Sequence, residues 1–154
     1  MEEPLEVTAH LTNEKVQFTG VSGGKPAITF DYTPPLGDGE GYTPLELLLM
    51  SLAVCSGTTN LILLRGMKKT VSWVSVSARG IRRETHPTSF ERISLDFIFK
   101  SPDATEHDVQ RAMHLSEETY CPVWAMLKGA VEIIPTHTII APEDTAKPRK
   151  GDRR

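Results

Sequence analysis

The longest feature of the hydropathy pattern is an apolar run over residues 45–64, which places apolar side chains on nearly every side of a helix. Thr43, Pro44 and Glu46 occupy the positions of an N-cap, a first-turn proline and the third residue of a capping box. A helix that is apolar all round is usually buried in a core. A membrane span has a similar length, but polar residues interrupt this run. The pattern therefore predicts a buried helix that ends near the Arg-Gly pair at residues 65–66.

Segments with partial period-two alternation lie on both sides of this helix. The first 32 residues contain three short ones, separated by turn-forming residues, which predict a meander of antiparallel strands. After the helix, residues 70–78 and 91–99 predict two strands joined by a polar hairpin. We expect the apolar faces of these strands to lie against the long helix.

The last third of the chain predicts two helices and a strand. Thr105 and Asp108 have capping spacing before a segment with one apolar face. Pro122 cannot continue that helix but suits the first turn of a new one, with Cys121 as its cap. Residues 130–134 predict a final strand. Helices and strands are thus segregated, which indicates an α+β fold in one domain over residues 1–140, followed by a flexible charged tail over 141–154.

Composition narrows the classes of partner. The 154 residues include 17 basic and 20 acidic side chains, giving a net charge of −3 and a pI of about 5.9. This balance does not favour nucleic acid or an anionic membrane as a partner. The first 64 residues carry eight acids and two lysines, and the first arginine is Arg65. The acidic start does not resemble a signal peptide, so we expect a cytoplasmic protein.

The two cysteines, Cys55 and Cys121, are the candidates for chemistry. They are too few for a disulfide-rich scaffold or a cysteine-only zinc site, and the histidine spacing does not match a helical zinc pair. We therefore expect no metal and no cofactor. Cys55 lies within the apolar run, where it is either a small buried hydrophobe or a reactive thiol. Cys121 precedes Pro122 at a helix start, which suits either a thiolate or an inert structural cap.

Both cysteines lie in segments that resemble motifs of the OsmC/Ohr family. Residues 42–57 resemble its central-helix motif, and residues 115–123 resemble its second motif. Residues 86–90, with the strand after them, resemble the intervening stretch in the OsmC-like branch. The resemblance covers roughly residues 10–135.

The resemblance implies an OsmC-like fold, with antiparallel strands around a long buried central helix, in an intertwined homodimer with two active sites at the subunit interface. It also implies a thiol peroxidase for organic hydroperoxides, which an external dithiol returns to the reduced form. By motif position, Cys55 is the peroxidatic cysteine and Cys121 the resolving cysteine, and Glu46 is a third candidate catalytic residue. Cys55 would become a sulfenic acid, which Cys121 would convert to a disulfide.

Two positions differ from the best-characterised members of that family. Those members have a glutamate directly after the motif proline, where this chain has Leu45 and then Glu46. They also use an arginine from the N-terminal region to lower the pKa of the peroxidatic cysteine, and no arginine precedes Arg65 here. Without a cation, an apolar site raises the pKa of a thiol. The alternative is therefore a non-catalytic homodimer that binds a ligand or senses redox state through the same apolar pocket.

Overall fold

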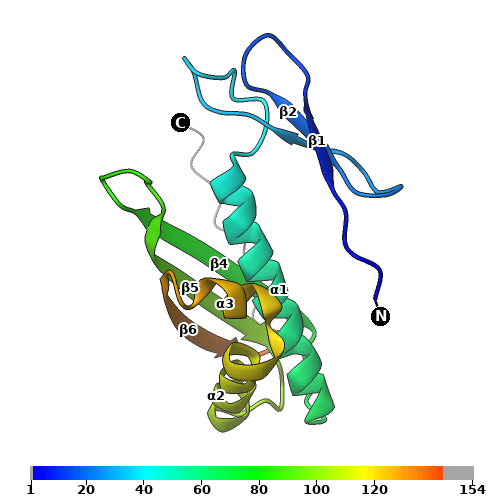
Figure 1. The fold of residues 1–154 in the computed structure, drawn as a ribbon. Helices are drawn as coiled ribbons and strands as arrows, with labels where there is room; N and C mark the ends of the chain where they lie inside the picture. The colour runs from blue at the N-terminus through cyan, green and yellow to red at the C-terminus, as the bar shows by residue number, and fades with distance from the viewer. Residues whose placement is uncertain (1, 144–154) are drawn as a thin grey trace. The chain divides into compact units, whose positions relative to one another are not determined.

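The computed structural model describes residues 2–143, and its contacts divide the chain into two units, Met1–Leu48 and Leu49–Arg154. Each unit is described by itself (Figure 1). The assignment of one domain over residues 1–140 stays a prediction. Residues 144–154 of the predicted tail lie outside the described residues.

The N-terminal unit contains the predicted antiparallel meander. Its strands are β1 (Thr8–Leu11), β2 (Phe18–Val21) and β3 (Ile28–Phe30), which pair in the order β1-β2-β3. Each strand is only three or four residues long, because turn-forming residues interrupt the alternation so often. The meander is thus confirmed.

A buried carboxylate, that of Asp31, organises the loop that follows β3. Its oxygens accept hydrogen bonds from the backbone N–H groups of Tyr32, Asp38 and Glu40, at 2.8, 3.2 and 3.2 Å. Burial alone would raise the pKa of Asp31, but these three N–H groups hold it below its ordinary value. The proline- and glycine-rich loop therefore has a fixed course up to the next helix.

The long helix α1 (Pro44–Gly66) has the predicted start and end. In the C-terminal unit, one side of it is buried, and the side chains there are mostly small or polar: Leu52, Ser56, Gly57, Asn60 and Leu64. A Cβ atom at Gly57 would lie 3.0 Å from a Val76 methyl group, so glycine allows the helix to approach the strand that carries Val76.

Among residues 2–143, side chains on the opposite side of α1 stay exposed. Val54 is 68% exposed and Ile62 is 63% exposed, because a single sheet covers only one face of a helix. The expectation of a helix buried all round thus holds for one face only. By length and composition alone, α1 could also cross a membrane. Its buried polar side chains Ser56 and Asn60 favour a helix packed on protein.

The C-terminal unit contains a three-stranded sheet in the order β4-β5-β6. Strands β4 (Trp73–Arg82) and β5 (Phe90–Lys100) form the predicted antiparallel hairpin. Strand β6 (Glu132–Ile140) extends well beyond the predicted residues 130–134 and pairs with β5 in parallel. It is longer because it pairs continuously with β5, from Glu132 opposite Arg92 to Ile140 opposite Lys100.

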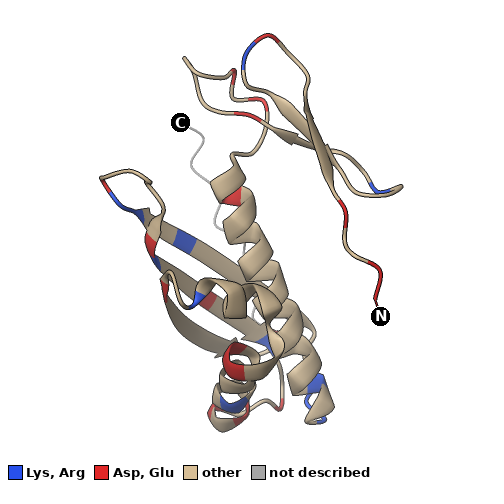
Figure 2. Cartoon of the chain, in the orientation of Figure 1, with Lys and Arg blue, Asp and Glu red and all other residues tan. Residues whose placement is uncertain are grey.

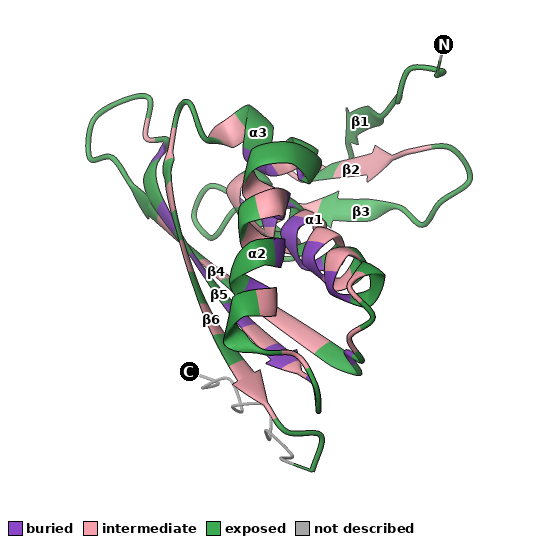
Figure 3. Ribbon diagram, turned by 90° about the horizontal axis from the view of Figure 1, so that it is seen from below, coloured by how far each residue is buried: buried purple, intermediate pink, exposed green. Residues whose placement is uncertain are grey.

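Two further helices connect β5 to β6 and supply the crossover that a parallel pair needs. They are α2 (Glu106–Leu115), with the predicted capping box between Thr105 and Asp108, and α3 (Pro122–Leu127). A π-helical turn, η1 (Ser116–Tyr120), joins them. The helices of this unit lie on one face of the sheet, and the buried residues gather between the two layers (Figures 1 and 3).

The core of the C-terminal unit follows the alternation of β5. Ile93, Leu95, Phe97 and Phe99 are fully buried, whereas most of the residues between them are exposed. Val109 and Ala112 of α2 and Trp124 of α3 are also buried. Burial of a side chain of this size stabilises a fold by roughly 1.5–3 kcal/mol. This packing holds α1 and α3 in position. Cys55 lies within α1, and Cys121 lies directly before α3.

Candidate functional site

The π-helical turn determines where Cys121 lies. After α2, the chain bulges through η1, and the N–H of Cys121 donates to the carbonyl of Ser116 at 2.9 Å. The backbone of Cys121 is then extended, and Pro122 begins α3. Such single π turns often occur at functional sites. Cys121 is therefore the N-cap residue, as predicted, but its side chain makes no capping hydrogen bond. The thiol is available for other contacts.

The two cysteines meet in the C-terminal unit. The Sγ atoms of Cys55 and Cys121 lie 3.3 Å apart, within hydrogen-bond distance. Both are free thiols, since this distance is well beyond the about 2.05 Å of a disulfide. Cys121 is buried, and Cys55 is partly exposed. Two residues that lie 66 positions apart in the chain thus form one site.

A third side chain, Ser56, completes the cluster. It is fully buried on α1, and its Oγ lies 3.6 Å from the Sγ of Cys121. One turn later, the amide of Asn60 donates to the Ser56 carbonyl at 2.9 Å. The sequence analysis did not single out Ser56. Its position next to Cys55, in the middle of an apolar run, was the available signal.

The electrostatic surroundings of Cys55 disfavour its thiolate. Burial raises the pKa of Cys55, the backbone N–H of Val123 lowers it, and the neighbouring sulfur of Cys121 raises it further. Two sulfurs this close cannot both carry a charge without repulsion. No cationic side chain of the described residues contributes to the shift. Within α1, the only charged residues are Glu46 in its first turn and Arg65 in its last turn, and Figure 2 shows the uncharged stretch between them. The expected raised pKa is confirmed.

Glu46, the third candidate, lies in the helix cap of the N-terminal unit. Its carboxylate accepts hydrogen bonds from the N–H and the hydroxyl of Thr43, at 2.7 and 2.9 Å. Its own N–H donates to the Thr43 hydroxyl at 3.3 Å. These bonds form the predicted capping box. A catalytic role for Glu46 stays a prediction.

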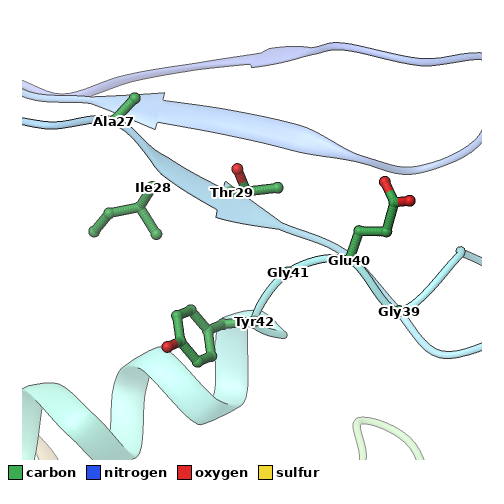
Figure 4. Close-up of a pocket in the computed structure, with 7 residues that line it drawn as sticks. All are labelled: Ala27, Ile28, Thr29, Gly39, Glu40, Gly41 and Tyr42. Atoms are coloured by element: carbon green, nitrogen blue, oxygen red, sulfur yellow. The ribbon is translucent and has the colours of Figure 1, made fainter.

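An open pocket lies elsewhere, in the N-terminal unit beside β3, with a volume of about 510 Å³ (Figure 4). Small side chains and backbone form much of its wall, and neither cysteine lines it. Its lining residues are Ala27, Ile28, Thr29, Gly39, Glu40, Gly41 and Tyr42.

The sequence predicts no metal site, and this stays a prediction. Over residues 2–143, no three His, Cys, Asp or Glu side chains gather in a way that could hold a metal ion.

The chain is similar to known proteins over most of its length. Residues 37–136, which include both cysteines, match the model of the OsmC-like protein family. Protein YhfA of Escherichia coli (strain K12) is 33% identical over 128 residues, which cover 83% of this chain and 93% of YhfA.

Two solved structures show the same fold. A hypothetical protein from Aquifex aeolicus VF5 has a TM-score of 0.80 at 29% identity, covering 92% of this chain and 100% of its own. An organic hydroperoxide resistance protein OsmC from Legionella pneumophila has a TM-score of 0.70 at 15% identity, covering 88% and 97%. At that identity the second likeness concerns the fold alone. With its two cysteine segments inside the matched residues, the chain belongs to the OsmC-like protein family.

Proposed function

We propose that this protein is a thiol-dependent peroxidase that reduces organic hydroperoxides through Cys55 and Cys121. The observation that carries the proposal is the 3.3 Å separation of the two sulfurs. At that distance a small movement brings them to bonding distance. The family also contains structural neighbours that are named organic hydroperoxide resistance proteins.

Exposure assigns the first step to Cys55. Because Cys55 is partly exposed and Cys121 is 2% exposed, a peroxide reaches Cys55 first. The Cys55 thiolate attacks one oxygen of the hydroperoxide, and the O–O bond breaks. The sulfur is oxidised to a sulfenic acid, while the alkoxide leaves, takes up a proton and becomes an alcohol. The N–H of Val123 is the group that stabilises the thiolate.

Cys121 performs the second step. Its thiol loses a proton and attacks the sulfur of the Cys55 sulfenic acid, and the S–O bond breaks. The departing hydroxide takes up a proton and leaves as water. A disulfide between Cys55 and Cys121 remains, and an external dithiol reduces it by two thiol–disulfide exchanges. A reducing cytoplasm supplies such dithiols.

A homodimer is part of the same proposal. The exposed side of α1 carries apolar residues, among them Met50, Val54 and Ile62, which are 41%, 68% and 63% exposed. A row of large apolar side chains on a helix is typical of a protein interface. A second copy of this chain would cover it and enclose Cys55 in apolar walls. Such walls favour a hydrocarbon-bearing peroxide over hydrogen peroxide.

The direct test mixes reduced protein with cumene hydroperoxide and follows peroxide consumption and protein mass. We expect one intramolecular disulfide between Cys55 and Cys121, and faster consumption of cumene hydroperoxide than of hydrogen peroxide. Cys55→Ser should abolish consumption, whereas Cys121→Ser should stop at the sulfenic acid. If both thiols stay reduced, the proposal is wrong.

One observation favours a second function, a non-catalytic dimer that binds a ligand or senses redox state. The pKa of Cys55 is raised, and no cationic side chain of the described residues lowers it. The pH dependence of Cys55 alkylation separates the two functions. A pKa below about 7 supports catalysis, and a pKa near about 8.5 or above supports ligand binding or an inert thiol.

A further inference from the structure

We infer that Ser56 is a positioning residue for Cys121: its hydroxyl donates a hydrogen bond to the Cys121 sulfur, aims it at Cys55 and stabilises it as a thiolate when it attacks. The inference rests on the proposed redox pair and goes beyond it by assigning a role to a residue that is not a cysteine. The observations that carry it are the 3.6 Å separation of Ser56 Oγ and Cys121 Sγ and the complete burial of Ser56.

The direction of the hydrogen bond follows from counting protons. The Cys121 thiolate that attacks has no proton, so it can only accept a hydrogen bond. The Ser56 hydroxyl has one proton and lies 3.6 Å from this sulfur. In the attacking state the hydrogen bond therefore runs from Ser56 to Cys121.

Burial makes this bond costly to lose. A hydroxyl buried without a partner costs about 1–3 kcal/mol. A helical serine usually avoids this cost by donating to the carbonyl four residues earlier. Among the described residues, the partner of the Ser56 hydroxyl is instead the sulfur of Cys121. The serine thus contributes its only proton to the cysteine pair, and the fixed helix α1 holds both Ser56 and Cys55.

The bond is suited to the second step rather than the first. Cys121 must give up its proton before it attacks the sulfenic sulfur, and no cationic side chain of residues 2–143 contributes at the neighbouring Cys55. The Ser56 hydroxyl, 3.6 Å from the Cys121 sulfur, is a neutral O–H donor for the Cys121 thiolate. The proton from Cys121 goes to the departing hydroxide, which leaves as water. Ser56 keeps its own proton throughout.

The experiment isolates the attack of Cys121 from peroxide chemistry. Reduced full-length protein reacts with the aromatic disulfide DTNB. The accessible Cys55 releases one coloured thiolate and becomes a mixed disulfide, and Cys121 then attacks Cys55 and releases a second. The first phase reports Cys55 and the second reports Cys121. Both phases are recorded from about pH 6 to about pH 10, a range that brackets the ordinary thiol pKa of about 8.5.

In Ser56→Ala we expect an unchanged first phase and a second phase that is about three- to tenfold slower at neutral pH, because the attacking sulfur loses a hydrogen bond that stabilises its negative charge. The midpoint of the second phase should move to higher pH. Ser56→Thr, which keeps the hydroxyl, should restore the rate. Ser51→Ala, which removes an exposed hydroxyl from the same helix, should behave like the wild type.

A second phase in Ser56→Ala with the wild-type rate and pH profile would overturn the inference. Alanine favours helix, so the variant is expected to fold, and its melting curve verifies this. If Ser56→Ala is partly unfolded at the assay temperature, both phases are recorded below its melting transition, with the same expected slowing. Wild-type protein that shows both DTNB phases but consumes no hydroperoxide would refute the proposed peroxidase and leave the role of Ser56 standing.

A matched peroxide arm uses one equivalent of cumene hydroperoxide in the presence of dimedone, which traps sulfenic acid. In Ser56→Ala, the trapped fraction of Cys55 should rise several-fold, because the slower Cys121 competes less well with the trap. An equal trapped fraction in wild type and variant would contradict the role of Ser56 in resolution.

Discussion

Oxidation of Cys55 and Cys121 to a disulfide should stabilise the folded chain strongly. The two sulfurs lie 3.3 Å apart, so joining them requires a movement of about 1.2 Å to reach disulfide length. The bond would close a loop of 66 residues. A cross-link over a loop of this length restricts the unfolded chain far more than the folded one.

The size of the effect follows from the loop. In the chain-entropy treatment, closing a loop of this length removes about 15 cal/mol/K from the unfolded state, or about 4 kcal/mol at 25 °C. Strain in the folded state reduces this figure. For a domain of about 150 residues, each kcal/mol shifts the melting temperature by about 2–4 °C, so the oxidised protein should melt up to about 8–16 °C higher.

The assay compares melting curves of the reduced protein and of protein oxidised with one equivalent of diamide. Mass spectrometry first confirms the loss of two hydrogens and the absence of cross-linked dimers. Cys55→Ser and Cys121→Ser serve as matched controls, because each removes one thiol and cannot form the bond. Diamide should leave their melting temperatures unchanged.

Two results would refute the reasoning. If diamide gives no intramolecular disulfide, the two sulfurs do not meet in solution as they do in the structure. If the disulfide forms and lowers the melting temperature, strain in the folded state exceeds the loop contribution. Either result would also weaken the proposed resolving role of Cys121.

Three further predictions concern single groups. Hydrogen bonds from Thr105 and a lysine contact hold the pKa of Asp108 at about 2. The Asp108 carboxylate therefore stabilises the fold above its unfolded pKa of about 4, and this stabilisation is lost as the pH falls toward about 2. In urea titrations, Asp108→Asn should be less stable than the wild type at pH 7 and should lose less stability on acidification. Gly80→Ala should cost about 1–3 kcal/mol, because the new Cβ meets a buried phenylalanine ring, whereas Gly24→Ala should cost little in the same denaturation assay. Alkylation of Cys55 by iodoacetamide should have its midpoint at a lower pH in Cys121→Ser than in wild type, because the neighbouring sulfur raises the pKa; equal midpoints would contradict this.

Local rules predicted most of the elements correctly. The capping box at Thr43 set the start of α1, and the proline after Cys121 set the start of α3. These signals depend on residues within four positions of one another, so a single sequence contains them fully. The same holds for the raised pKa of Cys55, which follows from an apolar run without a charge.

Features that depend on distant partners were not predictable in this way. Strand β6 extends to Ile140 because β5 offers it a parallel partner along its whole length, although β6 contains Pro135. The proline is tolerated because β6 lies at the edge of the sheet. Ser56 was missed for the same reason, since its partner lies 65 residues away across the fold.

The two chemical steps of the proposed reaction are limited by different properties. An ordinary thiol with a pKa of about 8.5 is about 3% thiolate at pH 7, and the raised pKa of Cys55 lowers that fraction. The second step is intramolecular, with the sulfurs held 3.3 Å apart, where effective molarities reach about 10⁵–10⁸ M. The attack on peroxide is therefore the slower of these two steps. A several-fold slower Cys121 would then leave kcat almost unchanged, and this is why Ser56 has to be tested by DTNB phases and sulfenic acid trapping rather than by steady-state rates.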